Sequence, residues 1–336
     1  MPRMRQEKSQ IHLSRNTCRM GGDKIYMGPL RGFTERPFRD AYAEFFSGVD
    51  VVLAPFIPLV TVDYINPSRL RDILPNNERI PLIPQVIGNS ASQIIQMAEV
   101  LKSYAYEEIN WNLGCPMPKI TKKKRGSGLL LYPEEIHTLL SQVFENIDIR
   151  FSLKTRTGFQ DTSLFSELAD VFCQFPLASL TVHTRTGSQM YSGTADKEFL
   201  LPYLEKFSNT ELIYNGDIFS VEDFETLKNL MPSISSWMIG RGLIRNPFLG
   251  EEIKTGEKKF NRNRFFSFHK MLNENVAKTS TSEKTHLNRM KGYWTQFRFL
   301  FNDRETIKNR ILRAQSVKDF LVAAEEIIKN SGLQEH

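Results

Sequence analysis

The sequence predicts a (β/α)8 barrel that is followed by a small bundle of helices. From residue 24 to residue 240, short runs rich in β-branched and aromatic residues alternate with longer amphipathic stretches, as in parallel βα proteins. There are eight such runs, whereas doubly wound sheets usually stop at about five to seven strands. After Gly250 only helical patterns remain. We therefore expect a catalytic barrel over residues 24–250 and a helical domain over residues 251–336.

The expected strands are short and are separated by helical patterns or turn residues. The eight strands are residues 24–29, 50–54, 82–87, 108–112, 150–155, 179–183, 211–215 and 236–239. Barrel helices are expected at 90–102 with Ser90 as N-cap, at 133–145 with proline in the first turn, and at 221–230 after Ser220. The C-terminal helices are expected at 265–277, 287–301, 304–314 and 317–330, with a loop over 278–284.

The composition is that of a globular protein. The chain has 336 residues, of which 40% are hydrophobic and 24% are charged, and this excludes a wholly disordered chain. No stretch approaches the roughly 20 apolar residues of a membrane span. Cys18, Cys115 and Cys173 lie far apart and lack the spacing of a zinc site or a disulfide framework. We expect a cytoplasmic, monomeric protein without a metal and without a membrane partner.

Positive charge is concentrated at the two ends of the chain. The formal net charge is +6, and residues 251–336 hold 17 basic and 11 acidic side chains. A basic domain beside a near-neutral barrel suits a nucleic-acid partner, although many basic helical segments bind nothing. Residues 1–23 are also basic but lack the apolar segment of a secretion signal. We interpret them as a loose basic tail in preference to a mitochondrial presequence.

Polar residues lie at the carboxyl ends of five of the expected strands or just beyond them. They are Asn112, Lys154, His183, Asn215 and Arg241. Any one of them could cap the next helix, but barrel enzymes collect their catalytic groups at these strand ends. The sequence therefore predicts that the five side chains converge at one mouth of the barrel.

Cys115 lies in a Gly/Pro-containing loop directly after the fourth strand. A lone cysteine is most often a small apolar core residue, but Gly114 and Pro116 favour a displayed, solvent-accessible thiol. Such a thiol could act as a nucleophile or as a proton donor. His183 could serve as its base, although its expected position two strands away, beside Arg185, better suits an anion or a cofactor.

Two further segments suit phosphate groups. A basic run precedes Gly126 and Gly128 near the same mouth, and it is either a phosphate contact or a solvated loop. Asn215-Gly-Asp217 and Gly240-Arg-Gly242 follow the last two strands, where barrels commonly bind a phosphorylated cofactor. Lys154 could place its cation against the edge of a flavin ring or could form a buried salt bridge with a neighbouring carboxylate.

Taken together and in this order, the motifs resemble those of the FMN-dependent tRNA-dihydrouridine synthases. The resemblance spans residues 24–250. Its motifs are Pro29-Leu-Arg-Gly-Phe-Thr-Glu-Arg-Pro-Phe-Arg39, Asn112-Leu-Gly-Cys-Pro116, Lys154-Thr-Arg-Thr-Gly158, His183-Thr-Arg-Thr186, Asn215-Gly-Asp217 and Gly240-Arg-Gly242. The chain departs from the family where Ala-Pro-Met is common, because it has Gly28-Pro29-Leu30 followed by Arg31.

The resemblance implies FMN at the barrel mouth, NADPH as its reductant and tRNA as the substrate. It implies hydride delivery to C6 of an extruded uridine, with Cys115 as the proton donor to C5. The implied FMN contacts are Pro29, Leu30, Arg31, Gln85, Lys154, His183, Asn215, Gly216, Asp217, Gly240 and Arg241. The expected substrate contacts are Asn112, Lys122, Lys123, Lys124, Arg125 and Arg185, together with the C-terminal helices.

Three alternatives accompany this interpretation. The same chemistry could act on ribosomal RNA, since these motifs do not specify the RNA or the target uridine. A small-molecule FMN oxidoreductase of the dihydroorotate dehydrogenase kind would need no basic C-terminal domain. A non-catalytic RNA-binding barrel would not need the intact set of Cys115, Lys154, His183 and Arg241.

Overall fold

The structure is a computed structural model that describes residues 22–60 and 66–333. The basic tail that we expect over residues 1–23 lies outside these ranges except for its last two residues, and so does Cys18.

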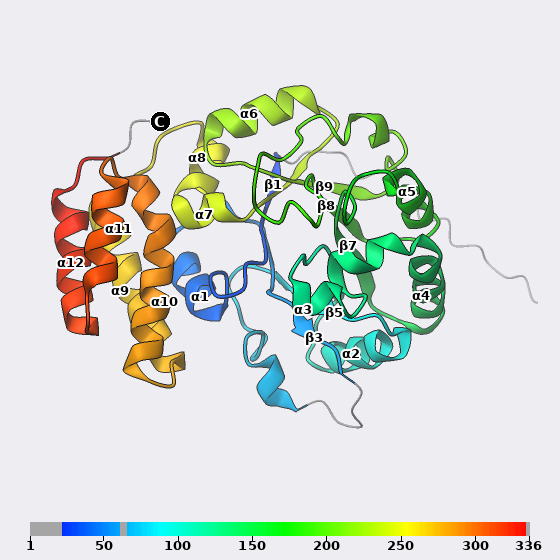
Figure 1. The fold of residues 1–336 in the computed structure, drawn as a ribbon, viewed down its shortest axis with the longest axis horizontal. Coiled ribbons are helices and arrows are strands. Elements are labelled where there is room, and N and C mark those ends of the chain that lie inside the picture. The colour runs from blue at the N-terminus through cyan, green and yellow to red at the C-terminus, as the bar shows by residue number, and fades with distance from the viewer. Residues whose placement is uncertain (1–21, 61–65, 334–336) are drawn as a thin grey trace, which may run out of the picture.

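Parallel strands form the predicted barrel, with helices around it (Figure 1). The strands are β1 (Lys24–Met27), β2 (Val51–Leu53), β3 (Ile57–Pro58), β4 (Leu82–Ile83), β5 (Gln85–Ile87), β6 (Glu108–Leu113), β7 (Arg150–Arg156), β8 (Ser179–His183), β9 (Glu211–Asn215) and β10 (Ser236–Ile239). All eight expected runs contain strand, and the predicted fold class is confirmed. The short strand β3 was not predicted.

The barrel closes through a strand that is divided at Pro84. Proline has no N–H group to donate to a sheet ladder, and it separates β4 from β5 where the sequence predicts one strand. β4 pairs with β2, whereas β5 pairs with β6 on the other side. Because β10 also pairs with β1, the strands around Pro84 complete the ring.

Helices follow most of the strands, and most of these helices surround the barrel (Figure 1). They are α1 (Arg36–Phe45), α2 (Ala91–Ser103), α3 (Pro118–Thr121), α4 (Pro133–Asn146), α5 (Phe165–Cys173), α6 (Val221–Leu230), α7 (Arg241–Arg245) and α8 (Leu249–Thr255). The Ser220 hydroxyl accepts a hydrogen bond from the Asp223 amide, as expected for an N-cap. Ser90 also occupies an N-cap position, but its hydroxyl bonds to that of Ser92.

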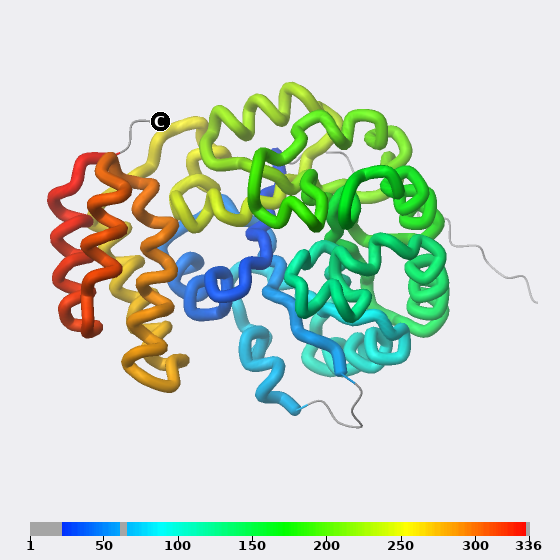
Figure 2. The backbone as a smooth tube through the Cα atoms, in the orientation of Figure 1, coloured from blue at the N-terminus to red at the C-terminus, as the bar shows by residue number. Residues whose placement is uncertain are grey.

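The C-terminal helices stand as a group beside the barrel (Figures 1 and 2). They are α9 (Arg262–Thr279), α10 (Glu283–Phe297), α11 (Arg304–Arg313) and α12 (Val317–Asn330). The loop between α9 and α10 is shorter than predicted because Ser282 caps α10 by accepting a hydrogen bond from the Thr285 amide. Within the described ranges, no helix is both long and apolar enough to cross a membrane.

An aromatic cluster joins these helices to the barrel. The ring of Phe38 in α1 stacks on Tyr293 of α10 with centroids 5.7 Å apart, and it meets Phe268 of α9 edge to face at 5.8 Å. The Tyr293 hydroxyl donates a hydrogen bond of 2.8 Å to the carbonyl of Phe33. The loop after β1 is therefore held in place by a helix that lies more than 250 residues later in the chain.

Candidate active site

A cavity of about 620 Å³ opens at the carboxyl ends of the barrel strands. Its size is within the usual range for small-molecule and cofactor sites. The lining includes Gly28, Pro29, Leu30 and Arg31 after β1, Phe56 after β2, Asn112, Gly114, Cys115, Pro116 and Lys119 from β6 onward, Lys154 and Arg156 of β7, His183 of β8, Asn215, Gly216, Gly240 and Arg241 from β9 and β10, and Gln296 of α10. Among these residues, all in the described part of the chain, there are five Lys or Arg and no carboxylate.

The loop that carries Cys115 is fixed from both sides. The Oδ1 atom of Asn112 accepts hydrogen bonds from the amides of Gly114 at 3.0 Å and Cys115 at 2.9 Å. The Cys115 carbonyl accepts from the amide of Ser127 at 3.0 Å and from its hydroxyl at 3.1 Å. A side chain at Gly126, where φ is +56°, would approach the Cys115 carbonyl to 2.5 Å, so this glycine serves the tight packing of the loop.

The Cys115 side chain lines the cavity but is only 9% exposed. This differs from the displayed thiol that the Gly/Pro loop predicts, because Gly126 and Ser127 pack against the loop. Burial raises the pKa of Cys115 above its ordinary value, and the Met117 amide and neighbouring cations offset only part of that increase. The sulfur is therefore a protonated thiol at neutral pH, which suits a proton donor better than a nucleophile.

A ladder of buried amides lies beneath the cavity. Gln85 donates to the Oδ1 atom of Asn110 at 2.8 Å and accepts from Asn112 at 2.8 Å, and Asn110 donates to the Ser152 hydroxyl at 2.9 Å. Gln85 is fully buried, so the structure does not support the expected direct contact between Gln85 and FMN. Asn112 lines the cavity, and its amide is bonded to Gln85 and to the Cys115 loop. It therefore positions that loop, and its expected contact with the substrate stays a prediction.

Lys154 projects into the cavity and donates a hydrogen bond of 2.7 Å to Oδ1 of Asn215. No carboxylate among the described residues pairs with it, so the buried salt bridge that the sequence left open is absent from this part of the chain. Burial, with the nearby charge of Arg156, lowers the pKa of Lys154 to about 7. The amine can therefore gain a proton when a ligand with acceptor atoms or negative charge binds beside it.

This lowered pKa predicts how the stability of the ligand-free protein depends on pH. In the unfolded state Lys154 keeps its proton up to about pH 10.5, whereas in the folded state it keeps the proton only up to about pH 7. Between these pH values the unfolded state therefore binds more protons than the folded state. The free energy of unfolding should rise with pH in this window, and Lys154→Met should flatten that rise. Urea unfolding at several pH values measures it, with the exposed Lys123→Met as control. An unchanged slope in Lys154→Met would contradict the assignment.

Asp217 organises the cations at the β8–β10 side. Its carboxylate accepts hydrogen bonds from Arg185 at 2.9 Å, Arg241 at 2.8 Å and the Ala195 amide at 3.0 Å. Burial would raise the pKa of Asp217, but the hydrogen bonds from Arg185 and Ala195 lower it below its usual value. Asp217 does not line the cavity, so it positions Arg241 and does not make the direct contact expected from the sequence.

Arg185 and His183 occupy different positions relative to the cavity. The Arg185 side chain is 1% exposed and is bonded to Asp217, so it cannot make the expected contact with RNA in this arrangement. One of its nitrogens lies 3.3 Å from Nε2 of His183. Burial and the surrounding cations lower the pKa of His183 well below its ordinary value. His183 is neutral and lines the cavity, as a cofactor contact requires.

The predicted basic run lies beside the cavity and not in its lining. Lys124 pairs with Glu135 at 3.0 Å, and its ammonium group lies 3.9 Å from the centroid of the Tyr132 ring. Arg125 donates to the side chain of Asn89 at 3.1 Å. Lys122 and Lys123 are exposed. These placements leave Lys122 and Lys123 as the members most open to a phosphate.

Several lining residues were not predicted. Arg156 lies two positions beyond Lys154 and therefore on the same side of β7, a signal that strand alternation offered. It donates to the carbonyls of Gly114 at 2.9 Å and Thr186 at 2.6 Å. Phe56, Lys119 and Gln296 carried no comparable signal, because they lie in a connection between strands, in the short helix α3 and in a helix distant in sequence.

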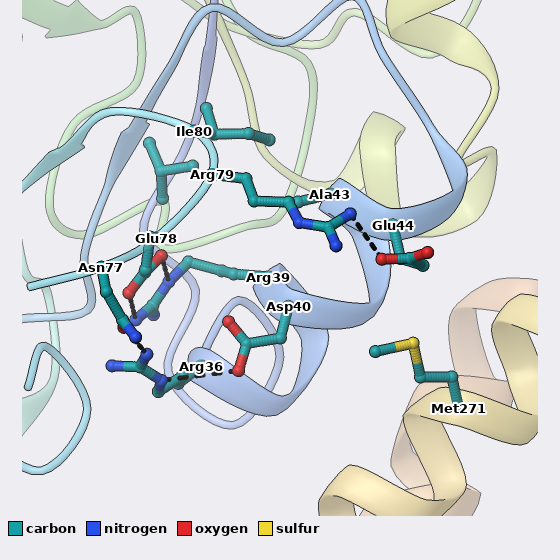
Figure 3. Close-up of a pocket in the computed structure, with 11 residues that line it drawn as sticks. Arg36, Arg39, Asp40, Ala43, Glu44, Asn77, Glu78, Arg79, Ile80 and Met271 are labelled. Atoms are coloured by element: carbon teal, nitrogen blue, oxygen red, sulfur yellow. Dashed lines mark hydrogen bonds and ion pairs between the residues drawn. The ribbon is translucent and has the colours of Figure 1, made fainter. Parts of the chain in front are cut away.

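A second cavity of about 280 Å³ lies between α1, residues 77–80 and Met271 (Figure 3). The charged side chains that line it are paired with one another as Arg36 with Asp40, Arg39 with Glu78, and Arg79 with Glu44. Its charges are mutually compensated, which indicates a structural role. The barrel-mouth cavity, whose cations outnumber its carboxylates, is therefore the candidate active site.

Comparisons with known proteins show the family and the fold of the chain. The family model described as dihydrouridine synthase matches residues 26–331. A Pasteurella multocida tRNA-dihydrouridine synthase B is 29% identical over 232 residues, covering 68% of each chain. A Neisseria meningitidis tRNA-dihydrouridine(16) synthase is 26% identical over 242 residues, covering 70% of this chain and 72% of the relative. A solved morphinone reductase variant in complex with tetrahydroNAD shares the fold, with a TM-score of 0.51 at 11% identity over 72% of this chain and 90% of that one.

Proposed function

The chain belongs to the dihydrouridine synthase family, and we propose on that premise that it reduces the C5–C6 double bond of a uridine in tRNA. The observation that carries this proposal is the buried Cys115 side chain in the barrel-mouth cavity, whose lining among the described residues holds five Lys or Arg and no carboxylate. A neutral thiol can donate a proton to carbon, and an excess of cations suits a substrate and a cofactor that both carry phosphate.

We propose FMN as the cofactor and NADPH as the reductant. The donor set fits this group: Lys154, neutral His183 and Asn215 can contact a polar ring, and Gly216, Gly240 and Arg241 can surround a phosphate at the β9–β10 side. Bound FMN would supply the hydride for C6 of the uracil. The Asp217 carboxylate would hold Arg241 in position for the phosphate.

Side chains of the protein would carry out the remaining steps. Cys115 would hold its proton within the cavity until the uracil C5 atom lies against the sulfur, and would then transfer it. Asn112 and Ser127 fix the loop, so the thiol does not reorganise when the base arrives. Because the thiol is nearly buried, the base must leave its stack to reach it, as is general for enzymes that act on a nucleobase.

We propose that residues 251–336 bind the RNA that flanks the target uridine. At the junction of α7 with the C-terminal helices, three guanidinium groups surround the ring of Phe299. Arg245 lies 4.0 Å, Arg298 4.9 Å and Arg304 5.1 Å from its centroid. Arg245 also bonds to Gln296, which lines the cavity. A phosphate backbone could therefore pass from these arginines directly to the cavity.

The proposed function predicts a defined product. Protein loaded with FMN should convert uridine to dihydrouridine in a tRNA transcript when NADPH is added, and mass spectrometry of the digested RNA should show the gain of two hydrogens. The names of the relatives favour tRNA over ribosomal RNA, and a ribosomal RNA fragment is the comparison substrate. Efficient reduction of a free unsaturated substrate such as orotate or an enone, without RNA turnover, would favour a small-molecule oxidoreductase. A protein that retains no flavin would favour a non-catalytic barrel.

A further inference from the structure

We infer that Arg31 and Lys119 bind the phosphodiester groups on either side of the target uridine. This inference rests on the proposed function and deepens it, because it assigns the contacts that bring the uracil to Cys115. It also moves Arg31 from the FMN contacts expected from the sequence to the RNA.

The two cations follow other strands than those that carry the polar residues proposed for FMN. Around the ring, β1, β2, β4, β5 and β6 form one half, and β7 to β10 form the other. Arg31 follows β1 and Lys119 follows β6, and both line the cavity. The proposed FMN contacts Lys154, His183 and Asn215 lie on β7, β8 and β9. The two cations are therefore available for a second anion.

Within the part of the chain that the structure describes, Arg31 and Lys119 are the cations of the cavity that have neither a carboxylate partner nor a side-chain hydrogen bond. Arg156 is bonded to two carbonyls, Arg241 to Asp217 and Lys154 to Asn215. Across residues 22–60 and 66–333, by contrast, neither Arg31 nor Lys119 forms an ion pair or a side-chain hydrogen bond, and both are exposed. The guanidinium of Arg31 lies over the ring of Phe56, 5.6 Å from its centroid, which limits its direction without neutralising its charge.

Their position beside the thiol favours RNA over the phosphates of the reductant. Both charges are close enough to Cys115 to act on its pKa, although burial remains the larger effect. When the C5 atom of a uridine lies against the sulfur of Cys115, the sugar and the flanking phosphates of that nucleotide lie near the thiol, at the mouth of the cavity. Cations on the β1 and β6 sides of the thiol can therefore hold the chain where it enters and leaves the cavity.

The test separates the two half-reactions. Arg31→Gln, Lys119→Gln and the double variant are compared with Lys102→Gln, which removes an exposed lysine paired with Asp148 on the outer surface. Enzyme whose FMN has been reduced photochemically is mixed with increasing concentrations of unmodified tRNA, and NADPH oxidation by each variant is measured without RNA. We expect each pocket substitution to raise the KM for tRNA about 3- to 10-fold, while the rate of NADPH oxidation matches that of Lys102→Gln.

Binding measurements keep this inference distinct from the proposed function. The slope of the logarithm of tRNA affinity against the logarithm of salt concentration should decrease by about one released counterion for each pocket substitution. The slope should not change in Lys102→Gln. If the wild-type protein forms no dihydrouridine but these slopes fall, the phosphate contacts stand and the proposed function fails. Unchanged slopes and KM values would overturn the inference. So would a loss confined to NADPH oxidation, which would assign the two cations to the reductant.

Discussion

Cys115→Ala should lower the rate of dihydrouridine formation by about 10²- to 10⁴-fold while flavin content and tRNA affinity stay close to those of the wild type. The expected loss is large because Cys115 is the thiol of the cavity, and the lining contains no carboxylate that could donate a proton in its place. A single turnover of flavin-reduced enzyme with tRNA measures the step directly, since it does not depend on NADPH.

A second variant and a pH profile test the role of the thiol more closely. Cys115→Ser keeps nearly the same shape but offers a much weaker acid, so it should resemble Cys115→Ala in rate. Burial raises the pKa of Cys115, so the wild-type rate should stay level through neutral pH and decline only above the ordinary pKa of a thiol. Full turnover by Cys115→Ala, or a decline already near neutral pH, would contradict a thiol proton donor.

Asp217→Asn should destabilise the flavin-free protein by about 3–5 kcal/mol. Among the described residues Asp217 is the one carboxylate paired with Arg185, whose side chain is 1% exposed, so the substitution leaves a buried cation without a counter-charge. It also releases Arg241, so the affinity for FMN should fall as well. Urea unfolding gives the first quantity, and flavin fluorescence quenching gives the second.

The matched control for Asp217 is Asp170→Asn. Asp170 pairs with Lys206 at the surface, where an ion pair contributes about 0–1 kcal/mol. Both substitutions remove one carboxylate charge and keep the shape of the side chain. The difference between their losses in the free energy of unfolding therefore measures the effect of burial. Equal effects of the two substitutions would show that the Asp217 cluster does not anchor this side of the barrel.

The sequence predicted the barrel well because strand and helix signals are local. All eight runs contain strand, and residues 221–230 form the predicted helix. The division of the third strand at Pro84 was foreseeable from the missing N–H group of proline, but its role in closing the ring was not, because closure depends on which neighbours β4 and β5 select. The short loop before α10 followed from a cap at Ser282 within a polar segment that suggested a longer connection.

The candidate site was predictable in its residues more than in their roles. Motif positions at strand ends brought Cys115, Lys154, His183 and Asn215 to one cavity, as the barrel geometry requires. The sequence could not show that Gln85 lies beneath that cavity, because its partners depend on the register between β5 and β6. Spacing could not reveal the contribution of Gln296 either, since it requires α10 to pack against α7.

The contacts of Tyr293 have a consequence for how such a protein can change over evolution. Its ring covers Phe38, and its hydroxyl fixes the Phe33 carbonyl in the loop that also carries Arg31. The C-terminal helices therefore help to shape the mouth of the barrel and are not an independent module. Helices that replaced these would have to restore both contacts, so the packing of the C-terminal helices and the shape of the loop after β1 are inherited together.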